Sequence, residues 1–395
     1  MARRAAFLLP LLTLTALPAP AEAQGGEVYE RVVEKLGSRF HDLEWRRETL
    51  PRIAARLRPQ ARASATAEEE RAVIQYLLEQ VPSSHTALYS EATWRRLFDD
   101  LANRRRPTLG LELVHLEEGF FVHTLLEGGP AAEAGVLSGD RVLTVDGLPP
   151  EKSPRLDWRS DDASLPDPPV HALRCSAGEE VVLELERHPG LRLGVRLRAR
   201  VLSSLEASLA TARVQEVEGR RVAWFHLRMV HSRQTDKVLR QLLIGRFAEA
   251  EALVLDLRGR GGSASMAQRL LALFDGPGAV WTRPVVALVD GATRSAKEVL
   301  AWELRERGIA RLIGERTAGA VIPATFARVA PDAILMFPST TLGAYTERLE
   351  GKGVEPDVLV RAAGPWSAGA DPILEAGLQE AARLAATASR RSRSG

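Results

Sequence analysis

The sequence predicts an α/β protein with a helical region before its core and a β-rich region between the two. Three observations support this class. Short apolar segments alternate with helical patterns from about Leu205 to Val360, an order typical of α/β cores. Apolar residues recur at helical spacing from about Glu27 to Asn103. Between these two regions, residues 139–147 alternate as they do in strands, and Val181 to Leu185 and Leu193 to Leu197 have further strand patterns.

The start of the chain has the pattern of a secretory signal peptide over residues 1–23. Arg3 and Arg4 precede an apolar run, and Ala21-Glu22-Ala23 forms a small-residue cleavage site. The apolar run is too short to span a bilayer. We therefore expect an exported protein, periplasmic or secreted, without a stable membrane anchor.

Composition argues against several function classes. The 395 residues carry 53 basic and 51 acidic side chains, and no basic block alternates with aromatic residues, so we expect no nucleic-acid partner. The one cysteine, Cys175, has no partner for an internal disulfide and is interpreted as a buried small apolar residue. His226 and His231 form a close pair without further ligands nearby, so neither a metal nor a cofactor is predicted.

The helical region covers residues 24–106. Two groups of apolar residues repeat there at three- and four-residue spacing: Val32, Val33 and Leu36, then Val73, Ile74, Leu77 and Leu78. The three arginines at 104–106, followed by Pro107, are interpreted as a solvated junction to the next region.

Residues 107–203 contain a loop followed by a strand pattern at Leu109-Gly110-Leu111-Glu112-Leu113, and a hairpin pattern at 139–147 that ends in an Asp-Gly turn. These runs resemble the carboxylate-binding loop and the hairpin of PDZ domains. The resemblance implies that Leu109 to Leu113 receive an extended peptide as an added strand. A Pro/Asp-rich insert from Pro149 to Pro169 is predicted to be a loop.

The α/β core is assigned to residues 204–365. Its predicted strands are Val222–Leu227, Ala252–Leu257, Val285–Val289, Ala310–Ile313 and Ile334–Phe337. Residues 366–395 are predicted to form a C-terminal helix and a disordered basic tail from about Ser389.

Ser295 is the strongest candidate for chemistry. It follows a buried-strand pattern and a polar turn, and it stands at the mouth of a helical pattern. A serine on such a turn presents its hydroxyl near the N–H groups of a helix start, which favour developing negative charge. The position is suited to a nucleophile.

The segment from Pro284 to Ala320 resembles the core of the S41 serine peptidases, which include the C-terminal processing and tricorn-type proteases. Ser295-Ala296-Lys297-Glu298, the Gly/Thr-rich run 314–320 and the run from Glu350 to Asp357 carry the resemblance. It implies a ClpP/crotonase-like α/β core with an inserted PDZ domain, and serine endopeptidase activity. The family's common general base is a lysine at the position that Ala320 holds here, so the usual serine–lysine dyad is absent.

The tricorn-type branch of the family uses a histidine base instead, placed before the PDZ region. Here Pro82-Ser83-Ser84-His85-Thr86 resembles that segment. The resemblance implies His85 as general base, Ser84 as its hydrogen-bonded partner and Glu350 as the residue that holds the polar network. His226 remains a rival base. Lys297 is expected to face solvent on the helix. Because positions i and i+2 of a helix do not face each other, it is not expected to replace the missing dyad lysine.

The oxyanion hole is assigned from the run Asp256 to Gly262, which resembles the family's glycine loop after a core strand. Paired glycines let backbone N–H groups approach a substrate carbonyl closely. We therefore expect the N–H of Gly261 or Gly262 to act together with that of Ala296.

Two functions of different class follow. The first is an exported endopeptidase acting on polypeptides, C-terminal tails among them, recruited through the PDZ domain. The second is an inactive peptide-binding protein of the cell envelope on the same fold, which Ala320 favours. The sequence leaves open the oligomeric state, and whether the PDZ domain activates or inhibits.

Overall fold

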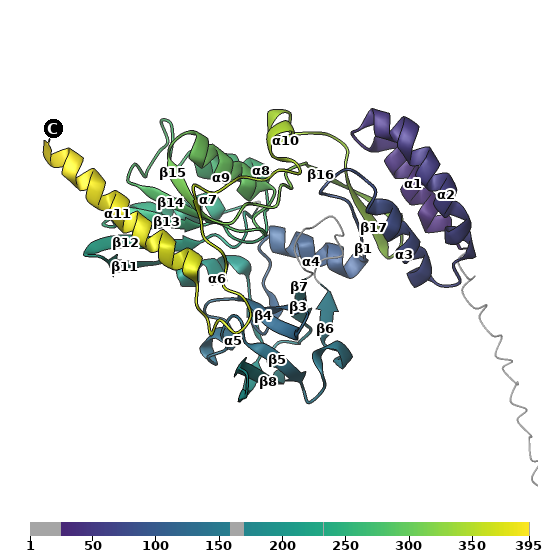
Figure 1. The fold of residues 1–395 in the computed structure, drawn as a ribbon, viewed down its shortest axis with the longest axis horizontal. Coiled ribbons are helices and arrows are strands. Elements are labelled where there is room, and N and C mark those ends of the chain that lie inside the picture. Colours follow the sequence, from purple (N-terminus) through teal and green to yellow (C-terminus); the bar gives the residue numbers. More distant parts are fainter. Residues whose placement is uncertain (1–24, 159–169, 232, 395) are drawn as a thin grey trace, which may run out of the picture.

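The computed structural model describes residues 25–158, 170–231 and 233–394. The predicted signal peptide therefore lies outside the described residues. Figure 1 shows a helical region at one end of the molecule, a layered α/β domain at the other, and a β-rich domain beside the α/β domain.

The N-terminal region is mainly helical, as predicted, and also contains one short strand that was not predicted. Thr66 and Ser90 each begin a helix by accepting a hydrogen bond from the backbone N–H three residues later. The elements are α1 Glu27–Arg39, α2 Leu50–Ala63, α3 Ala67–Leu78, β1 Ala87–Tyr89 and α4 Glu91–Leu101, with a short π-helical turn at Trp45–Thr49.

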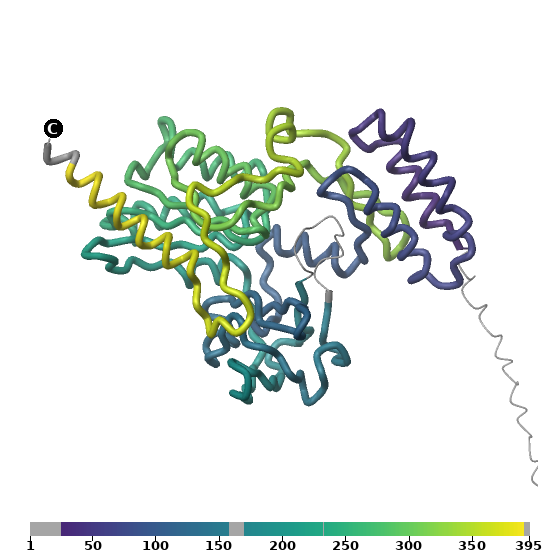
Figure 2. Tube along the Cα trace, viewed as in Figure 1, coloured from purple at the N-terminus to yellow at the C-terminus, as the bar shows by residue number. Residues whose placement is uncertain are grey.

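A β-hairpin from the far end of the chain completes this region. Strands β16 (Ala324–Ala330) and β17 (Ala333–Pro338) form an antiparallel sheet with β1 in the order β1-β17-β16. Leu335 and Phe337 lie fully buried in the same core as the apolar faces of α1–α3. Figure 2 shows the chain leaving the α/β domain for this hairpin and returning. The prediction that residues 334–337 belong to the α/β core sheet is therefore wrong.

The middle domain is a seven-stranded sheet of order β6-β7-β3-β4-β5-β8-β9. Strand β6 lies inside the insert that was predicted to be a loop, so that prediction is wrong for residues 156–158. The strands are β3 Leu111–Leu116, β4 Gly119–Leu125, β5 Arg141–Val145, β6 Leu156–Trp158, β7 Val170–Leu173, β8 Glu180–His188 and β9 Leu191–Arg198, with helix α5 Pro130–Glu133 and a 3-10 turn at Pro150–Lys152. A small two-stranded sheet of β2 (Arg106–Thr108) and β10 (Arg200–Leu202) joins this domain to its neighbours.

The α/β domain has one mixed sheet of order β11-β12-β13-β14-β15-β18. All neighbouring pairs are parallel except β11 with β12. Its strands are β11 Arg213–Val217, β12 Arg220–His226, β13 Ala252–Asp256, β14 Val285–Val289, β15 Ala310–Gly314 and β18 Val358–Leu359, and its helices are α6 Ser204–Thr211, α7 Thr235–Ile244, α8 Ala264–Leu271, α9 Ala296–Glu306, α10 Ala344–Leu349 and α11 Pro372–Ser394.

Helices cover both faces of this sheet. Alternate strand residues such as Leu253 and Leu255 pack against α7, α8 and α9, while Val254 and Val286 pack against α11. Burial on both faces explains why the sequence shows continuous apolar runs here.

Helix α11 also corrects a prediction. It runs to Ser394, so the tail from Ser389 that was predicted to be disordered is helical. Its alanines and arginines are strong helix formers, which explains the extension. Within the ranges described, no helix is both long and apolar enough to cross a membrane.

The shared core of hairpin and helices gives a first prediction. Leu335→Ala should lower the free energy of unfolding by about 2–5 kcal/mol, because it opens a cavity at a fully buried position. The matched control Leu43→Ala removes a side chain that is 44% exposed and should change it by less than about 0.5 kcal/mol. Urea unfolding measures both. Equal effects would contradict the packing of the hairpin against α1–α3.

Candidate active site

The candidate site lies at the carboxyl ends of the parallel strands, where open α/β sheets commonly bind ligands. Register places the last residues of neighbouring strands side by side, since His226 pairs with Asp256 and Val289 with Gly314. The loops that follow β12, β13, β14 and β15 therefore meet at one edge. They carry the predicted nucleophile Ser295 and the predicted oxyanion-hole residues Gly261 and Gly262, and Ala296, the third of those residues, begins α9.

Ser295 occupies the loop after β14 and directly precedes α9. Its backbone has φ 55° and ψ −125°, a conformation that costs a non-glycine residue on the order of 1–3 kcal/mol. Its N–H donates to the carbonyl of Ala320 at 2.8 Å. Strain of this kind is often found where a fold holds a reactive side chain in place.

A buried carboxylate holds this turn. Glu298 is fully buried on α9, and its oxygens accept from the N–H groups of Ser295 at 3.2 Å, Gly319 at 2.7 Å and Ala320 at 2.7 Å. The hydroxyl of Thr317 donates to it as well, at 2.5 Å. Burial raises the pKa of Glu298, although these donors act against the shift. The carboxylate thus joins the nucleophile turn to the loop after β15.

The structure brings Ser84, His85 and Glu350 together. Ser84 Oγ and His85 Nδ1 lie 2.9 Å apart. Glu350 Oε1 accepts from the N–H of Ser84 at 2.9 Å, and its Oε2 accepts from those of Val321 at 2.9 Å and Ile322 at 3.1 Å. Glu350 therefore links the histidine segment to the loop whose Ala320 carbonyl holds Ser295.

His85 is buried and electrically neutral. Burial, aided by the positive charge of Arg294, lowers the pKa of His85 to about 3. Arg294 directly precedes Ser295, so the imidazole lies within reach of charge on the nucleophile turn. In the described ranges, however, no hydrogen bond joins Ser295 Oγ to His85.

The glycine loop after β13 lies against the nucleophile. A Cβ built on Gly261 would stand 2.7 Å from the Cβ of Ser295 and 2.5 Å from the Arg294 carbonyl, so only glycine fits. The N–H groups of Gly261, Gly262 and Ala296 donate to no acceptor among the residues that the structure describes. All three remain available for a substrate oxyanion.

Lys297 does not face solvent, and that prediction is wrong. Helix α9 is buried on almost every side, so the position two residues after Ser295 faces the loops after β12 and β13. The Lys297 side chain is 0% exposed, and its Nζ donates to the carbonyls of Arg228 at 3.0 Å and Arg258 at 2.8 Å.

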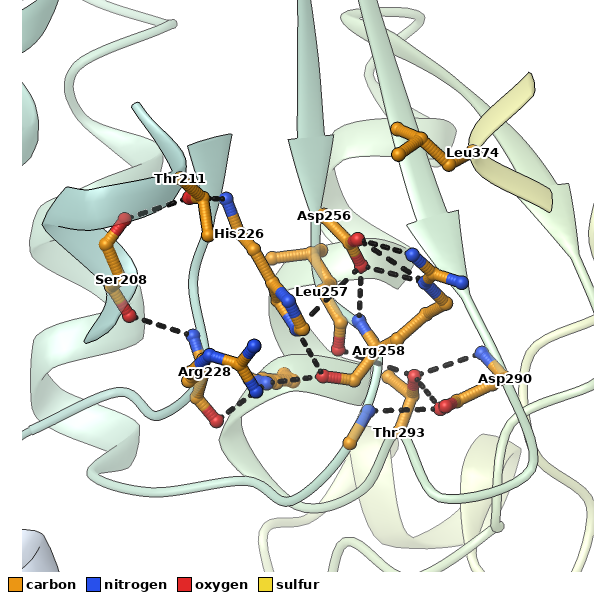
Figure 3. A network of polar contacts seen from close by, with 12 residues as sticks. Ser208, Thr211, His226, Arg228, Asp256, Leu257, Arg258, Asp290, Thr293 and Leu374 are labelled. Atoms are coloured by element: carbon orange, nitrogen blue, oxygen red, sulfur yellow. Dashed lines mark hydrogen bonds and ion pairs between the residues drawn. The ribbon is translucent and has the colours of Figure 1, made fainter. Parts of the chain in front are cut away.

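Figure 3 shows the polar network around these loops. Arg258 binds Asp256 through its Nε and Nη2 and Asp371 through both Nη atoms, which ties the end of β13 to the start of α11. His226 lies in the same network, 3.4 Å from the Arg258 carbonyl and 3.9 Å from Asp256. The rival base is therefore separate from the Ser84–His85–Glu350 group.

The candidate peptide-binding strand has neighbours on both sides. Strand β3 pairs with β4, and on its other edge Leu113 and Val114 pair with His171 and Val170 of β7. A peptide added at those two residues would have to replace β7.

Cys175 is partly buried beyond β7, and burial raises the pKa of its thiol. The described ranges contain no group of three or more His, Cys, Asp or Glu that could hold a metal ion.

Sequence reasoning missed two site residues, Glu298 and Lys297. Glu298 had a local signal, because Ser-x-x-Glu at a helix start is typical of a capping box. Lys297 had none, since nothing local shows that α9 is buried around its whole circumference.

Comparison with known proteins gives a consistent result. Residues 272–360 match the family model of Peptidase family S41. The tail-specific protease of Haemophilus influenzae is 26% identical over 197 residues, which is 49% of this chain and 27% of that protein. The carboxyl-terminal-processing protease of Picosynechococcus sp. is 26% identical over 218 residues, 49% of each protein. The chain thus spans about half the length of one relative, and less of the other.

A solved structure supports the fold. Mature CPAF complexed with lactacystin superposes with a TM-score of 0.58 at 11% identity, over 92% of this chain and 99% of that one. The predicted α/β fold class with an N-terminal helical region is confirmed.

The hydrogen bonds that Glu298 accepts give a second prediction. Glu298→Gln should lower the free energy of unfolding by about 2–3 kcal/mol. The carboxylate accepts hydrogen bonds from the N–H groups of Gly319 and Ala320 through its two oxygens, whereas an amide would place its own NH2 group against one of these N–H groups. The matched control Glu306→Gln, at the exposed end of the same helix, should change it by less than about 0.5 kcal/mol. Thermal and urea unfolding measure both. A Glu298→Gln protein as stable as the control would show that these hydrogen bonds to Glu298 are not formed.

Proposed function

Since the chain carries a domain of peptidase family S41, we propose that it is an exported serine endopeptidase with Ser295 as nucleophile and His85 as general base. One observation carries this proposal. Glu350 binds the N–H of Ser84 beside His85 and also the N–H groups of the loop that holds Ser295. Three segments far apart in sequence thereby meet at one edge of the sheet.

The proposed reaction is acyl transfer through a serine ester. Ser295 Oγ forms a bond to the scissile carbonyl carbon as His85 Nε2 takes the hydroxyl proton. His85 then gives that proton to the leaving amine as the C–N bond breaks. A water molecule hydrolyses the ester by the same proton transfers in reverse. The N–H groups of Ala296 and of Gly261 or Gly262 stabilise the oxyanion, each worth about 3–4 kcal/mol of barrier.

Each partner of His85 has a role in this scheme. With Ser84 Oγ accepting the Nδ1 proton, Nε2 carries the free lone pair that a base needs. Glu350 accepts from the N–H of Ser84, the residue before His85, and so holds the histidine segment in position. Ala320, where the family commonly has lysine, is 1% exposed and contributes only its backbone to Ser295. The proposal therefore assigns the base to His85, with His226 as the rival.

The substrate proposal is a polypeptide, with C-terminal tails as the leading class. Both relatives are named for processing carboxyl-terminal or tail segments. Leu109, Gly110, Leu111, Glu112 and Leu113 of the predicted PDZ domain are proposed to recruit the tail. Because β7 pairs with Leu113 and Val114, recruitment by strand addition at these residues requires β7 to move. The predicted signal peptide at 1–23 is the basis for export.

The catalytic pair gives a third prediction. Ser295→Ala and His85→Ala should each lower kcat/KM for casein or a peptide substrate by at least about 10³-fold, because neither residue acts without the other. Ser38→Ala and His188→Ala, which change exposed residues of the same types, should leave it unchanged. If only Ser295 matters, the base is elsewhere and His226 is the next candidate. An inert wild-type chain that still binds peptides would favour the inactive binding protein.

The low pKa of His85 gives a fourth prediction. A general base must be neutral, and a pKa lowered to about 3 keeps His85 neutral well below the usual histidine range. The rate of Ser295 labelling by a fluorophosphonate should therefore stay within about twofold between pH 7.5 and 5.5. An unshifted histidine, with a pKa of about 6.5, would lose about tenfold at pH 5.5. A labelling rate that falls as the pH drops through 6.5 would contradict a buried His85 as base.

A further inference from the structure

Lys297 is a buried lysine for which the proposed reaction has no role. It extends from α9, two residues after the nucleophile, and its side chain has no solvent exposure. Its Nζ donates to the carbonyls of Arg228 at 3.0 Å and Arg258 at 2.8 Å. Each carbonyl belongs to the second residue after a strand, Arg228 after β12 and Arg258 after β13. One amino group thus joins two neighbouring loops at equivalent positions.

The same two loops meet again beside the nucleophile. The N–H of Val230 donates to the carbonyl of Gly261 at 3.1 Å, and the N–H of Ser263 donates to the carbonyl of Val230 at 2.8 Å. Gly261 and Gly262 lie between these contacts. The direction of their N–H groups therefore depends on how the loop after β13 is held against the loop after β12.

We propose that Lys297 is a positioning residue that holds these two loops at the spacing which directs the Gly261 and Gly262 N–H groups toward the carbonyl attacked by Ser295. It touches neither nucleophile nor base in this role. The inference rests on the proposed function, because it names what sets the oxyanion hole of that site.

Charges of both signs surround Lys297. Asp256 and Asp290 favour its protonated form, while Arg228 and Arg258 disfavour it, and His226 and His231 lie close enough to feel its charge. Burial dominates and lowers the pKa of Lys297 to about 7. A buried lysine amino group without hydrogen-bond acceptors costs free energy. Lys297 therefore stays bound to its two carbonyl acceptors.

The test is kinetic and uses the full chain. Lys297→Met keeps the length of the side chain and removes its donors. We therefore expect the rate of phosphonylation of Ser295 by a fluorophosphonate, and kcat for a peptide ester, to fall about 10²-fold, with KM changed less than threefold. Lys297→Arg retains N–H donors and should recover at least a tenth of the wild-type rate. Lys237→Met makes the same change at an exposed position of α7 and should behave as wild type.

Hydrogen exchange supplies a readout that needs no activity. In Lys297→Met the Val230 and Ser263 amides should exchange at least tenfold faster, while amides of β13 and β14 stay protected. Should Lys297→Met fail to fold, the same comparison is made on Lys297→Gln, which is too short to reach both carbonyls.

Three results would overturn the inference: wild-type rates in Lys297→Met, an effect on KM alone, or unchanged exchange of these two amides. A wild-type chain that the probe does not label would instead overturn the proposed function. The exchange comparison still tests Lys297 in that case.

Discussion

The carboxylate of Glu350 is the contact on which the arrangement of the site depends. It follows α10, where the chain has just returned from the hairpin on the N-terminal helices. One of its oxygens binds Ser84 and the other binds the loop after β15. Without this bridge the histidine would belong to the helical region and the serine to the α/β domain, with little to fix one against the other. Charge-assisted bonds to backbone N–H groups hold both position and orientation.

Part of the candidate site could be predicted from the sequence, because some of its residues have a local signal. Ser295 stands at a strand-to-helix turn, and Gly261 and Gly262 follow a strand. His85 and Glu350 were predicted only through their resemblance to known motifs. The bond between Ser84 and Glu350 joins residues 266 positions apart, and no periodicity predicts such a contact. Their roles in catalysis remain proposals, whereas the neighbourhood itself is seen in the structure.

What the sequence could not predict depends on tertiary burial. Lys297 looks like a solvent-facing helix residue until the loops after β12 and β13 close over it. Residues 334–337 read as one more core strand, because an apolar run does not say which sheet it joins. The C-terminal tail reads as disordered from its charge, yet it continues a helix whose earlier turns are held on the sheet by Ile373 and Ala381. For Lys297 and residues 334–337, distant contacts overrode the local pattern.

The most direct test of the central claim is a crystal structure of the chain after reaction with diisopropyl fluorophosphate. The account predicts phosphorus bound to Ser295 Oγ, its free oxygen within about 3 Å of the N–H groups of Ala296 and of Gly261 or Gly262, and His85 Nε2 next to the ester oxygen. A structure with the adduct on Ser295 but its oxygen turned away from these N–H groups would contradict the assigned oxyanion hole. An adduct on another serine, or none, would contradict Ser295 as the nucleophile.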